Sequence, residues 1–492
     1  MPSHAENFIN NQWEASSSGA PFSSRNPATE ELVWQGQSAT EKEVTAAVTA
    51  AHHAHPIWSA LPIEERITYL KKFQGLLTEW SDRLSEMISK EIGKPRWEAK
   101  GEVAAMTNKI DISIEAYEDR CAKIIREHPS GLSVTRHKPH GVMAVFGPFN
   151  FPGHLPNGHI IPALLAGNTV VFKPSELAPG VGELTMQCWE AAGLPPGTIN
   201  MVQGGRETGR VLVGQRHIDG LLFTGSWGTG LVFSEQFAKH PEKILALEMG
   251  GNNPLIFSSA TDLKAAALTT IQSAFLTSGQ RCSCARRLIV IKSPQGEAFV
   301  EELKTMMDHI KVGPYTDSPE PFMGPVINES AVSHLLAVQN TLKTKGAIPL
   351  REMHLLKLNT SLMSPGLMDV THVALHVDEE VFGPFLQLIW VPNLEAAIIE
   401  ANNTAFGLTA GLLSYSQEEY DLFYQRIRAG VINWNTPLTG ASSAAPFGGI
   451  GRSGNFRPSA YYAADYCSYP VASLEAPEPK LPSKLPPGIT LE

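Results

Sequence analysis

Cys282 has the surroundings expected of a nucleophilic thiol. It lies between an apolar segment, residues 263–276, that predicts a helix and another, residues 288–291, that predicts a strand. Three arginines crowd it with positive charge, which predicts a lowered thiol pKa and a reactive thiolate: Arg281, Arg286 and Arg287. A buried structural cysteine is an equally good interpretation of this segment alone. Cys284 adds no zinc site, because no Cys or His pair at zinc-ligand spacing lies nearby, and no metal is expected.

Two further side chains could assist a nucleophile at a carbonyl group. Glu248 ends an apolar strand-like segment, residues 244–247, and two glycines follow it, so its carboxylate could face a cleft and act as a general base. Asn150 follows the strand-like segment 142–146, and its amide could donate a hydrogen bond to a developing oxyanion. Taken singly, Glu248 is more typical of a salt-bridged strand end, and Asn150 of a turn beside proline.

A glycine-containing segment between the strand-like residues 221–223 and a helix expected from Leu231 could bind a dinucleotide. It consists of Gly225, Ser226, Trp227, Gly228, Thr229 and Gly230. Its backbone N–H groups could meet a pyrophosphate. The glycine spacing is not G-x-G-x-x-G, so a plain tight turn fits equally well. Lys173 and Glu176 follow another strand-like segment and could hold ribose hydroxyls or form a solvated loop.

The elements that would position these side chains change character along the chain. Residues 40–93 predict three helices, the first beginning with a capping box formed by Thr40 and Glu43. From His140 onward, apolar strand-like segments alternate with helical ones, which predicts parallel pairing in a doubly wound α/β sheet. Residues 255–433 repeat this alternation and predict a second α/β unit. Such sheets bind ligands at the carboxyl ends of their strands, where most of the candidate residues fall.

The composition limits the classes of function. A chain of 492 residues is expected to form two or three domains. Its formal net charge of -10 disfavours nucleic-acid binding and means that any anionic substrate needs a local arginine cluster. The five cysteines are an odd number and mostly far apart, which predicts free thiols and a cytoplasmic location. We expect neither a signal peptide nor a membrane-spanning helix.

Together these segments resemble the aldehyde dehydrogenase superfamily over nearly the whole chain. Glu248 to Gly251 is similar to its general-base motif and Gly279 to Cys282 to its Gly-Gln-x-Cys nucleophile motif. Their separation of 34 residues (282 minus 248) is that of the family. The family's cofactor clamp and C-terminal signature are matched by Glu380 to Pro384, and by Pro446 to Gly449 with Ser453 and Gly454. The departures are Phe149, where many members have tryptophan, and Trp227 and Gly228 in the cofactor turn.

The resemblance implies an aldehyde dehydrogenase-like α/β fold with a doubly wound dinucleotide-binding domain, a second α/β catalytic domain and a small β oligomerisation flap. We expect the dinucleotide-binding domain at residues 1–118 and 141–248 and the catalytic domain at residues 249–446. Residues 119–140 and 463–492 are expected to form the flap of a homodimer or homotetramer.

The resemblance also implies catalytic roles. Cys282 would attack an aldehyde, Asn150 and the backbone N–H of Cys282 would stabilise the oxyanion, and a thioester would follow. Glu248 would then activate water to release the acid.

NAD is the cofactor that the resemblance implies. Lys173 and Glu176 would hold its adenosine ribose, and Glu380 and Phe382 its nicotinamide end. A carboxylate at Glu176 would repel a 2′-phosphate, so we expect NAD rather than NADP.

Within the superfamily, residues 454–467 and 280–287 are similar to the N-succinylglutamate 5-semialdehyde dehydrogenases of arginine catabolism by the succinyltransferase route. This resemblance implies a small aldehyde substrate with two carboxylates. Arg281 and Arg457 are candidate partners for these carboxylates, and Ser443 could add a donor.

Three alternatives stay open. The substrate could be another small anionic semialdehyde, or coenzyme A could take the acyl group, or the chain could be a non-catalytic binding protein. Glu248 favours water over coenzyme A, and the presence of both Cys282 and Glu248 speaks against a non-catalytic protein.

Overall fold

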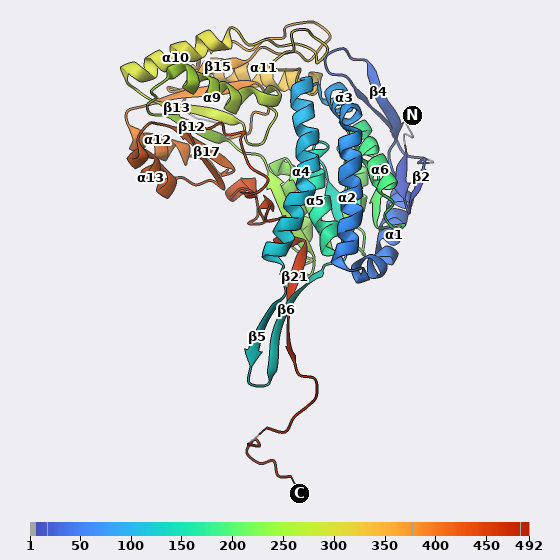
Figure 1. Cartoon of the computed structure of the whole chain (residues 1–492). Helices are drawn as coiled ribbons and strands as arrows, with labels where there is room; N and C mark the ends of the chain where they lie inside the picture. Colours follow the sequence, from blue (N-terminus) through green and yellow to red (C-terminus); the bar gives the residue numbers. More distant parts are fainter. Residues whose placement is uncertain (1–5, 17, 375–377, 483, 492) are drawn as a thin grey trace.

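Two seven-stranded sheets and a projecting three-stranded arm organise the described part of the chain (Figure 1). This computed structural model describes residues 6–16, 18–374, 378–482 and 484–491. The chain passes from the first sheet to the second between Met249 and Asn253, and its last strand returns to the arm. The predicted fold class, two α/β units with a doubly wound sheet and a small β flap, is confirmed.

The helices of the first unit begin and end much as their sequences predict. Its helices are α1 (Glu41–Ala60), α2 (Ile63–Glu79), α3 (Ser81–Ile92), α4 (Arg96–Arg120), α5 (His154–Ala166), α6 (Pro179–Ala192), α7 (Arg206–Val213) and α8 (Trp227–Phe237). The capping box of Thr40 and Glu43 is present at the start of α1. Helix α3 ends at Gly93, which adopts the left-handed conformation (φ 79°) that favours glycine.

The start of α8 differs from the prediction. The helix begins at Trp227 and not near Leu231, because Ser226 caps it: the backbone N–H of Thr229 donates to Ser226 Oγ at 3.3 Å. The glycines at 228 and 230, which suggested an extended turn, lie inside the first helical turns. The predicted cofactor turn is therefore mostly a helix N-terminus.

The first sheet carries helices on both faces. Its order is β11-β10-β7-β8-β9-β1-β2, parallel from β11 to β9. Its strands are β1 (Asn7–Ile9), β2 (Gln12–Glu14), β7 (Val142–Phe146), β8 (Thr169–Lys173), β9 (Ile199–Met201), β10 (Gly220–Gly225) and β11 (Ile244–Met249). Met143 and Val145 belong to the core shared with α2 to α6, whereas Val142 and Ala144 belong to the core shared with α1, α7 and α8. This alternation is typical of a covered parallel sheet.

The second sheet repeats the plan with order β14-β15-β16-β13-β12-β17-β18 and one antiparallel edge strand, β14. Its strands are β12 (Asn253–Phe257), β13 (Ala285–Ile291), β14 (Ile348–Arg351), β15 (Gly366–Asp369), β16 (Phe385–Val391), β17 (Thr409–Leu413) and β18 (Val431–Trp434). Helices α9 (Leu263–Phe275) and α10 (Pro294–Met307) share one core, and α11 (Glu329–Thr344), α12 (Leu394–Ala401) and α13 (Gln417–Arg426) share the other.

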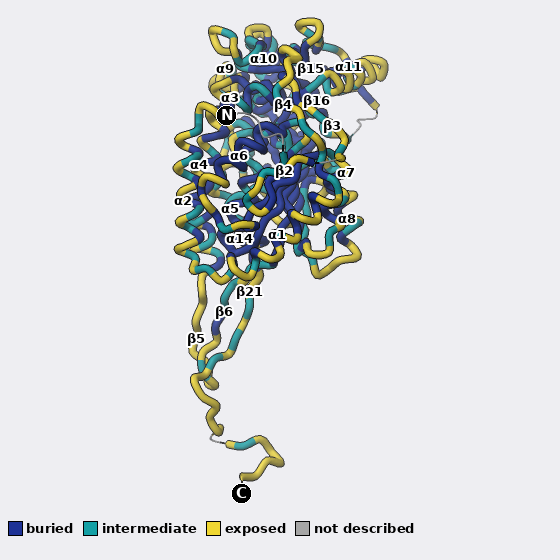
Figure 2. The backbone as a smooth tube through the Cα atoms, turned by 90° about the vertical axis from the view of Figure 1, so that its right-hand side faces the viewer, coloured by how far each residue is buried: buried dark blue, intermediate teal, exposed yellow. Residues whose placement is uncertain are grey.

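The arm projects from the first unit and is largely exposed along β5 (Figures 1 and 2). It consists of β5 (Ile124–His128), β6 (Gly131–Pro139) and β21 (Ser468–Glu475), paired antiparallel in the order β21-β6-β5. The short helix α14 (Ala463–Tyr466) lies inside the body against α4 and α5, so the arm proper resumes at Ser468.

The remaining elements are short. They are β3 (Pro21–Arg25), β4 (Leu32–Gln37), β19 (Pro446–Phe447), β20 (Ser459–Ala460) and the 3₁₀ turns η1 (Leu276–Gly279) and η2 (Gly451–Ser453). In the described ranges, no helix combines the length and the apolar composition needed to cross a membrane.

Candidate active site

A cavity of about 1220 Å³ lies at the carboxyl ends of β7, β8, β10 and β11 and is also lined by residues of the second unit. The structure brings together along it most of the residues singled out in the sequence: Asn150, Lys173, Glu176, Gly225, Ser226, Gly228, Thr229, Glu248, Arg281, Cys282, Glu380, Phe382 and Ser443. Trp227, Gly230 and Arg457 do not line it. The position at the strand ends is where doubly wound sheets bind ligands.

Cys282 lies just after an unusual turn. Three successive residues before it have left-handed backbone, with φ of 53° at Thr277, 56° at Ser278 and 69° at Gly279. A Cβ at Gly279 would lie 2.0 Å from the carbonyl oxygen of Gly383, so glycine is required there. Left-handed backbone at non-glycine residues is costly and persists only where the surroundings hold it.

Glu98 of α4 holds this turn. Its carboxylate accepts hydrogen bonds from the backbone N–H of Thr277 at 3.0 Å and from the Thr277 hydroxyl at 2.7 Å, and it pairs with Arg281. The Ser278 hydroxyl donates to the carbonyl oxygen of Gly324 at 2.7 Å. A helix of the first unit thus fixes the turn before Cys282 in the second unit. Glu98 was not predicted from the sequence. It could have been recognised because Glu98 and Glu102, four residues apart, lie on the same helix face.

The prediction of a lowered pKa and a thiolate at Cys282 is wrong. Burial, together with the carboxylates of Glu380 and Glu248, raises the pKa of Cys282 to about 12, while Arg286 lowers it less strongly. Arg281 is neutralised by Glu98. Arg286 is fully buried, and its guanidinium donates to the carbonyl oxygens of Gly279 at 2.6 Å and Arg281 at 2.8 Å.

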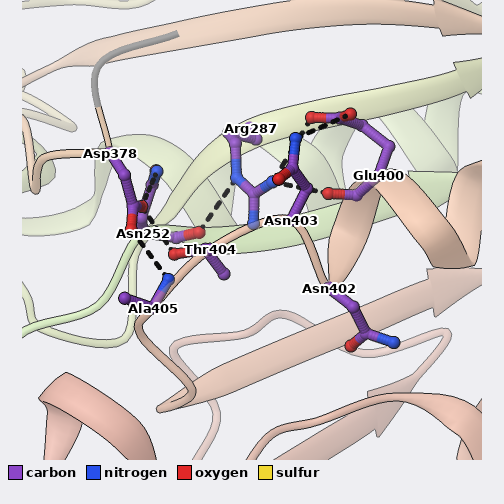
Figure 3. A pocket seen from close by; sticks show the side chains of 8 residues that line it. All are labelled: Asn252, Arg287, Asp378, Glu400, Asn402, Asn403, Thr404 and Ala405. Atoms are coloured by element: carbon purple, nitrogen blue, oxygen red, sulfur yellow. Dashed lines mark hydrogen bonds and ion pairs between the residues drawn. The ribbon is translucent and has the colours of Figure 1, made fainter.

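Arg287 lies in a separate polar pocket of about 330 Å³ (Figure 3). Its guanidinium donates to the carbonyl oxygens of Asn252 at 3.1 Å, Glu400 at 2.8 Å and Ala401 at 2.9 Å. The Glu400 carboxylate lies 3.6 Å away. Because neighbouring residues on a strand point to opposite faces, Arg286 and Arg287 cannot both face one thiol.

Glu248 is buried near the end of β11, with only 4% of its surface exposed. Burial raises its pKa well above the usual range, and an interaction with the backbone of Ser459 lowers it less. Its Oε2 atom has no hydrogen-bond partner in the described residues. A carboxylate of raised pKa that faces a cavity is suited to accepting a proton near neutral pH.

The segment after β19 holds this end of β11. The Asn455 side chain accepts from the backbone N–H of Leu247 at 3.0 Å and donates to the carbonyl oxygen of Leu245 at 2.8 Å. Gly448 allows a close approach, since a Cβ there would lie 2.9 Å from Glu248 Oε1.

Asn150 is buried beside the nucleophile turn. Its side-chain N–H donates to the carbonyl oxygen of Gln280 at 2.9 Å, which fixes the amide and leaves its second N–H unused by the described residues. The backbone N–H of Cys282 also has no acceptor within the described part of the chain. These are two donors of the kind that stabilises an oxyanion.

The N-terminus of α8 can receive a phosphate group. The backbone N–H groups of Trp227 and Gly228 have no acceptor among the described residues, and Gly228 has open space around it. Helix N-termini with free N–H groups bind anions. Gly230 serves packing, because a Cβ there would lie 2.2 Å from the Met249 sulfur. The residues present therefore fit a dinucleotide pyrophosphate.

Lys173 and Glu176 lie at one end of the proposed cofactor site. Lys173 Nζ donates to the carbonyl oxygens of Gly204 at 2.6 Å and Pro174 at 2.9 Å, and lies 3.7 Å from Glu176. Glu176 is half exposed at the cavity rim.

At the other end, Glu380 accepts from the backbone N–H of Gly251 at 3.2 Å, and burial raises its pKa to about 7. The Phe382 ring meets Phe149 edge to face at 5.8 Å. Phe149 therefore contributes an aromatic edge where many superfamily members carry tryptophan.

The predicted carboxylate anchors are less well placed. Arg281 lines the cavity, but its guanidinium is paired with Glu98 and donates to the Thr277 hydroxyl at 2.9 Å. Arg457 is exposed, and its one hydrogen bond among the described residues is to the carbonyl oxygen of Phe456 at 3.3 Å. Ser443 lines the cavity. Lys109, which also lines it, was not identified from the sequence.

The five cysteines are free thiols in the structure, and the described residues contain no group of three His, Cys, Asp or Glu side chains placed to hold a metal ion.

The chain is similar to known proteins over most of its length. Residues 13–470 match the family model described as the aldehyde dehydrogenase family. A relative from Hahella chejuensis, an N-succinylglutamate 5-semialdehyde dehydrogenase, is 52% identical over 98% of this chain and 99% of its own. An NADP-dependent glyceraldehyde-3-phosphate dehydrogenase of Bacillus halodurans, solved with NADP, shows a TM-score of 0.88 at 28% identity, covering 95% and 98% of the two chains. A Sinorhizobium meliloti protein solved with NAD shows 0.91 at 25% identity, covering 96% and 98%.

Proposed function

Because the chain belongs to the aldehyde dehydrogenase family, we propose that it oxidises N-succinyl-L-glutamate 5-semialdehyde to N-succinyl-L-glutamate with NAD. The observation that carries this proposal is the 52% identity to a relative of that name over 98% of the chain. The site supports it with a thiol, a carboxylate of raised pKa and two unused N–H donors on one cavity. The proposal places the enzyme in arginine catabolism by the succinyltransferase route.

The first step is attack by Cys282 Sγ on the aldehyde carbon, with the thiol proton passing to water. The side-chain N–H of Asn150 and the backbone N–H of Cys282 would donate to the oxyanion that forms. When bound, the oxidised nicotinamide supplies a hydride acceptor, so that the adduct on Cys282 becomes a thioester.

Hydrolysis of the thioester is the task of Glu248. Its carboxylate accepts a proton from water, the oxygen attacks the thioester carbon, and the C–S bond breaks to release the acid and Cys282. Coenzyme A could take the acyl group instead, but an unpartnered buried carboxylate oxygen on the same cavity favours water.

A substrate panel tests the proposed function. N-Succinylglutamate 5-semialdehyde should give the highest kcat/KM among succinate, glutamate and simple aliphatic semialdehydes, and the free acid should form without added thiol. A higher kcat/KM for one of the other anionic semialdehydes would show that this other aldehyde is the substrate. Turnover only in the presence of coenzyme A would show that coenzyme A, and not water, accepts the acyl group.

The NAD preference rests on Glu176 at the cavity rim. Its carboxylate would repel the 2′-phosphate of NADP, so Glu176→Gln should raise the NADP-to-NAD ratio of kcat/KM about tenfold. Arg206, whose guanidinium would attract a 2′-phosphate, also lines the cavity. The NADP-to-NAD ratio of kcat/KM therefore shows whether the carboxylate of Glu176 or the guanidinium of Arg206 determines the cofactor preference. Equal catalytic efficiency of the wild type with both cofactors would contradict the preference.

The arm supports a proposal of homo-oligomerisation, as a dimer or a tetramer. It exposes large apolar side chains on three strands: Ile124, Ile125, Leu132 and Leu474. Exposed apolar patches of this kind mark protein interfaces. We also propose a cytoplasmic location, since an odd number of free thiols suits a reducing compartment.

A further inference from the structure

Lys109 is a buried lysine on the wall of the active-site cavity. It lies in the second half of α4 and is only 1% exposed. One face of α4 lines the cavity through residues spaced by three or four positions: Glu98, Gly101, Glu102, Ala105 and Lys109. Lys109 therefore belongs to the same cavity as Cys282 and Glu248.

The charge of Lys109 has no partner. Its Nζ donates one hydrogen bond, to the carbonyl oxygen of Ala460 at 2.8 Å, and no carboxylate among the described residues lies within ion-pair distance. Two neighbouring cations are paired: the buried Lys94, which lies behind the cavity lining, is 2.7 Å from Glu102, and the partly buried Arg281 pairs with Glu98. Lys109 thus leaves this part of the cavity with an uncompensated positive charge.

An unpaired buried ammonium group is costly and favours binding of an anion. Burial lowers the pKa of Lys109 to about 8, which still leaves the ammonium form dominant at pH 7. Two of its three N–H groups remain free for a ligand. A carboxylate there would form charge-assisted hydrogen bonds, the strong class of such bonds.

His154 adds a second polar group to this part of the cavity. Its Nδ1 atom is buried and has no hydrogen-bond partner in the described residues. Burial and the charges of Lys109 and Lys94 lower its pKa to about 3, so its ring is neutral near pH 7. A neutral imidazole can donate one hydrogen bond to a carboxylate without adding charge.

We propose that Lys109 binds a carboxylate of the aldehyde substrate and gives the enzyme its preference for anionic aldehydes. The inference rests on the proposed function, since it names the group that recognises that substrate. It assigns to Lys109 the role for which Arg281 is already neutralised and Arg457 lies away from the cavity lining.

Three variants test this role: Lys109→Met, Lys109→Arg and Lys100→Met. Lys109→Met should lower kcat/KM for N-succinylglutamate 5-semialdehyde roughly 100-fold, mainly through KM, because a buried charge pair is lost. Its kcat/KM for the neutral aldehyde hexanal should stay within about threefold of the wild type. Lys109→Arg should recover most of the loss. Lys100→Met removes an equal charge from an exposed position of α4 and should behave as the wild type.

Ligand binding gives a readout that does not depend on turnover. The product N-succinylglutamate, titrated calorimetrically, should bind Lys109→Met roughly 100-fold more weakly than the wild type. NAD binding should be unchanged. Unchanged product affinity, or an equal loss for hexanal and the anionic aldehyde, would overturn the inference and leave Lys109 a structural residue.

The wild type separates this inference from the proposed function. If the wild type does not prefer the dianionic aldehyde over hexanal, the proposed function fails. If the wild type has the preference and Lys109→Met keeps it, only the role of Lys109 fails.

Discussion

Replacement of Cys282 by alanine is expected to lower kcat/KM for the aldehyde by at least about 10⁴-fold, because no covalent adduct can form. Steady-state NADH formation measures the loss. Binding of NAD should be retained, since the proposed cofactor contacts lie on α8, Lys173 and Glu380. The variant should also fold, because Cys282 is only partly buried and its backbone carbonyl remains held by Asn253 at 2.7 Å.

Cys284→Ala is the matched control for this variant. Cys284 lies two residues along, is fully buried, and its sulfur contacts the carbonyl oxygen of Leu276 at 3.8 Å. Its replacement should affect stability more than activity. If Cys282→Ala turned over as fast as Cys284→Ala, Cys282 would not be the nucleophile.

Glu248→Gln is expected to separate the two halves of the reaction. Acylation of Cys282 should still give one burst of NADH for each active site, and steady-state turnover should then fall roughly 10³-fold because the base is missing. Stopped-flow absorbance followed by steady-state measurement records both phases. Hydroxylamine, which attacks a thioester without a base, should partly restore turnover.

The pH dependence gives the same assignment a second test. Since the pKa of Glu248 is raised, its carboxylate form is populated only as the pH rises through that pKa, and thioester hydrolysis should rise with it. In Glu248→Gln, the steady-state rate should no longer show this rise with pH. The rate of the burst should still rise with pH, because the pKa of Cys282 is raised to about 12 and the thiolate is populated only at high pH. Absence of a burst in Glu248→Gln would contradict the assignment.

The sequence was most informative where a chemical group ends a strand or follows a regular turn. Cys282, Glu248 and Asn150, which line one cavity in the structure, were singled out in this way, and the alternation of strands and helices predicted both sheets. Such positions can be recognised locally, because strand periodicity and glycine turns depend on near neighbours.

The errors came from contacts that sequence proximity does not encode. Arg286 and Arg287 are close to Cys282 along the chain, but backbone carbonyl oxygens take their donors. Lys109 escaped notice because it shares the buried face of α4 with apolar residues such as Met106 and Ile110. The start of α8 was misplaced because two glycines concealed the cap at Ser226.

The pairing of β6 with β21 constrains when the arm can form during synthesis. Arg136 of β6 and Ser473 of β21 are joined by a hydrogen bond of 3.2 Å although 337 residues separate them. During synthesis, β5 and β6 leave the ribosome long before β21, because the parallel strands of the first sheet and the whole second unit are translated between them. The nascent β6 strand therefore exposes an unpaired edge, which is a template for non-native strand pairing. The complete arm can therefore form only after β21 has been synthesised, and the proposed assembly through the arm is expected to follow that step.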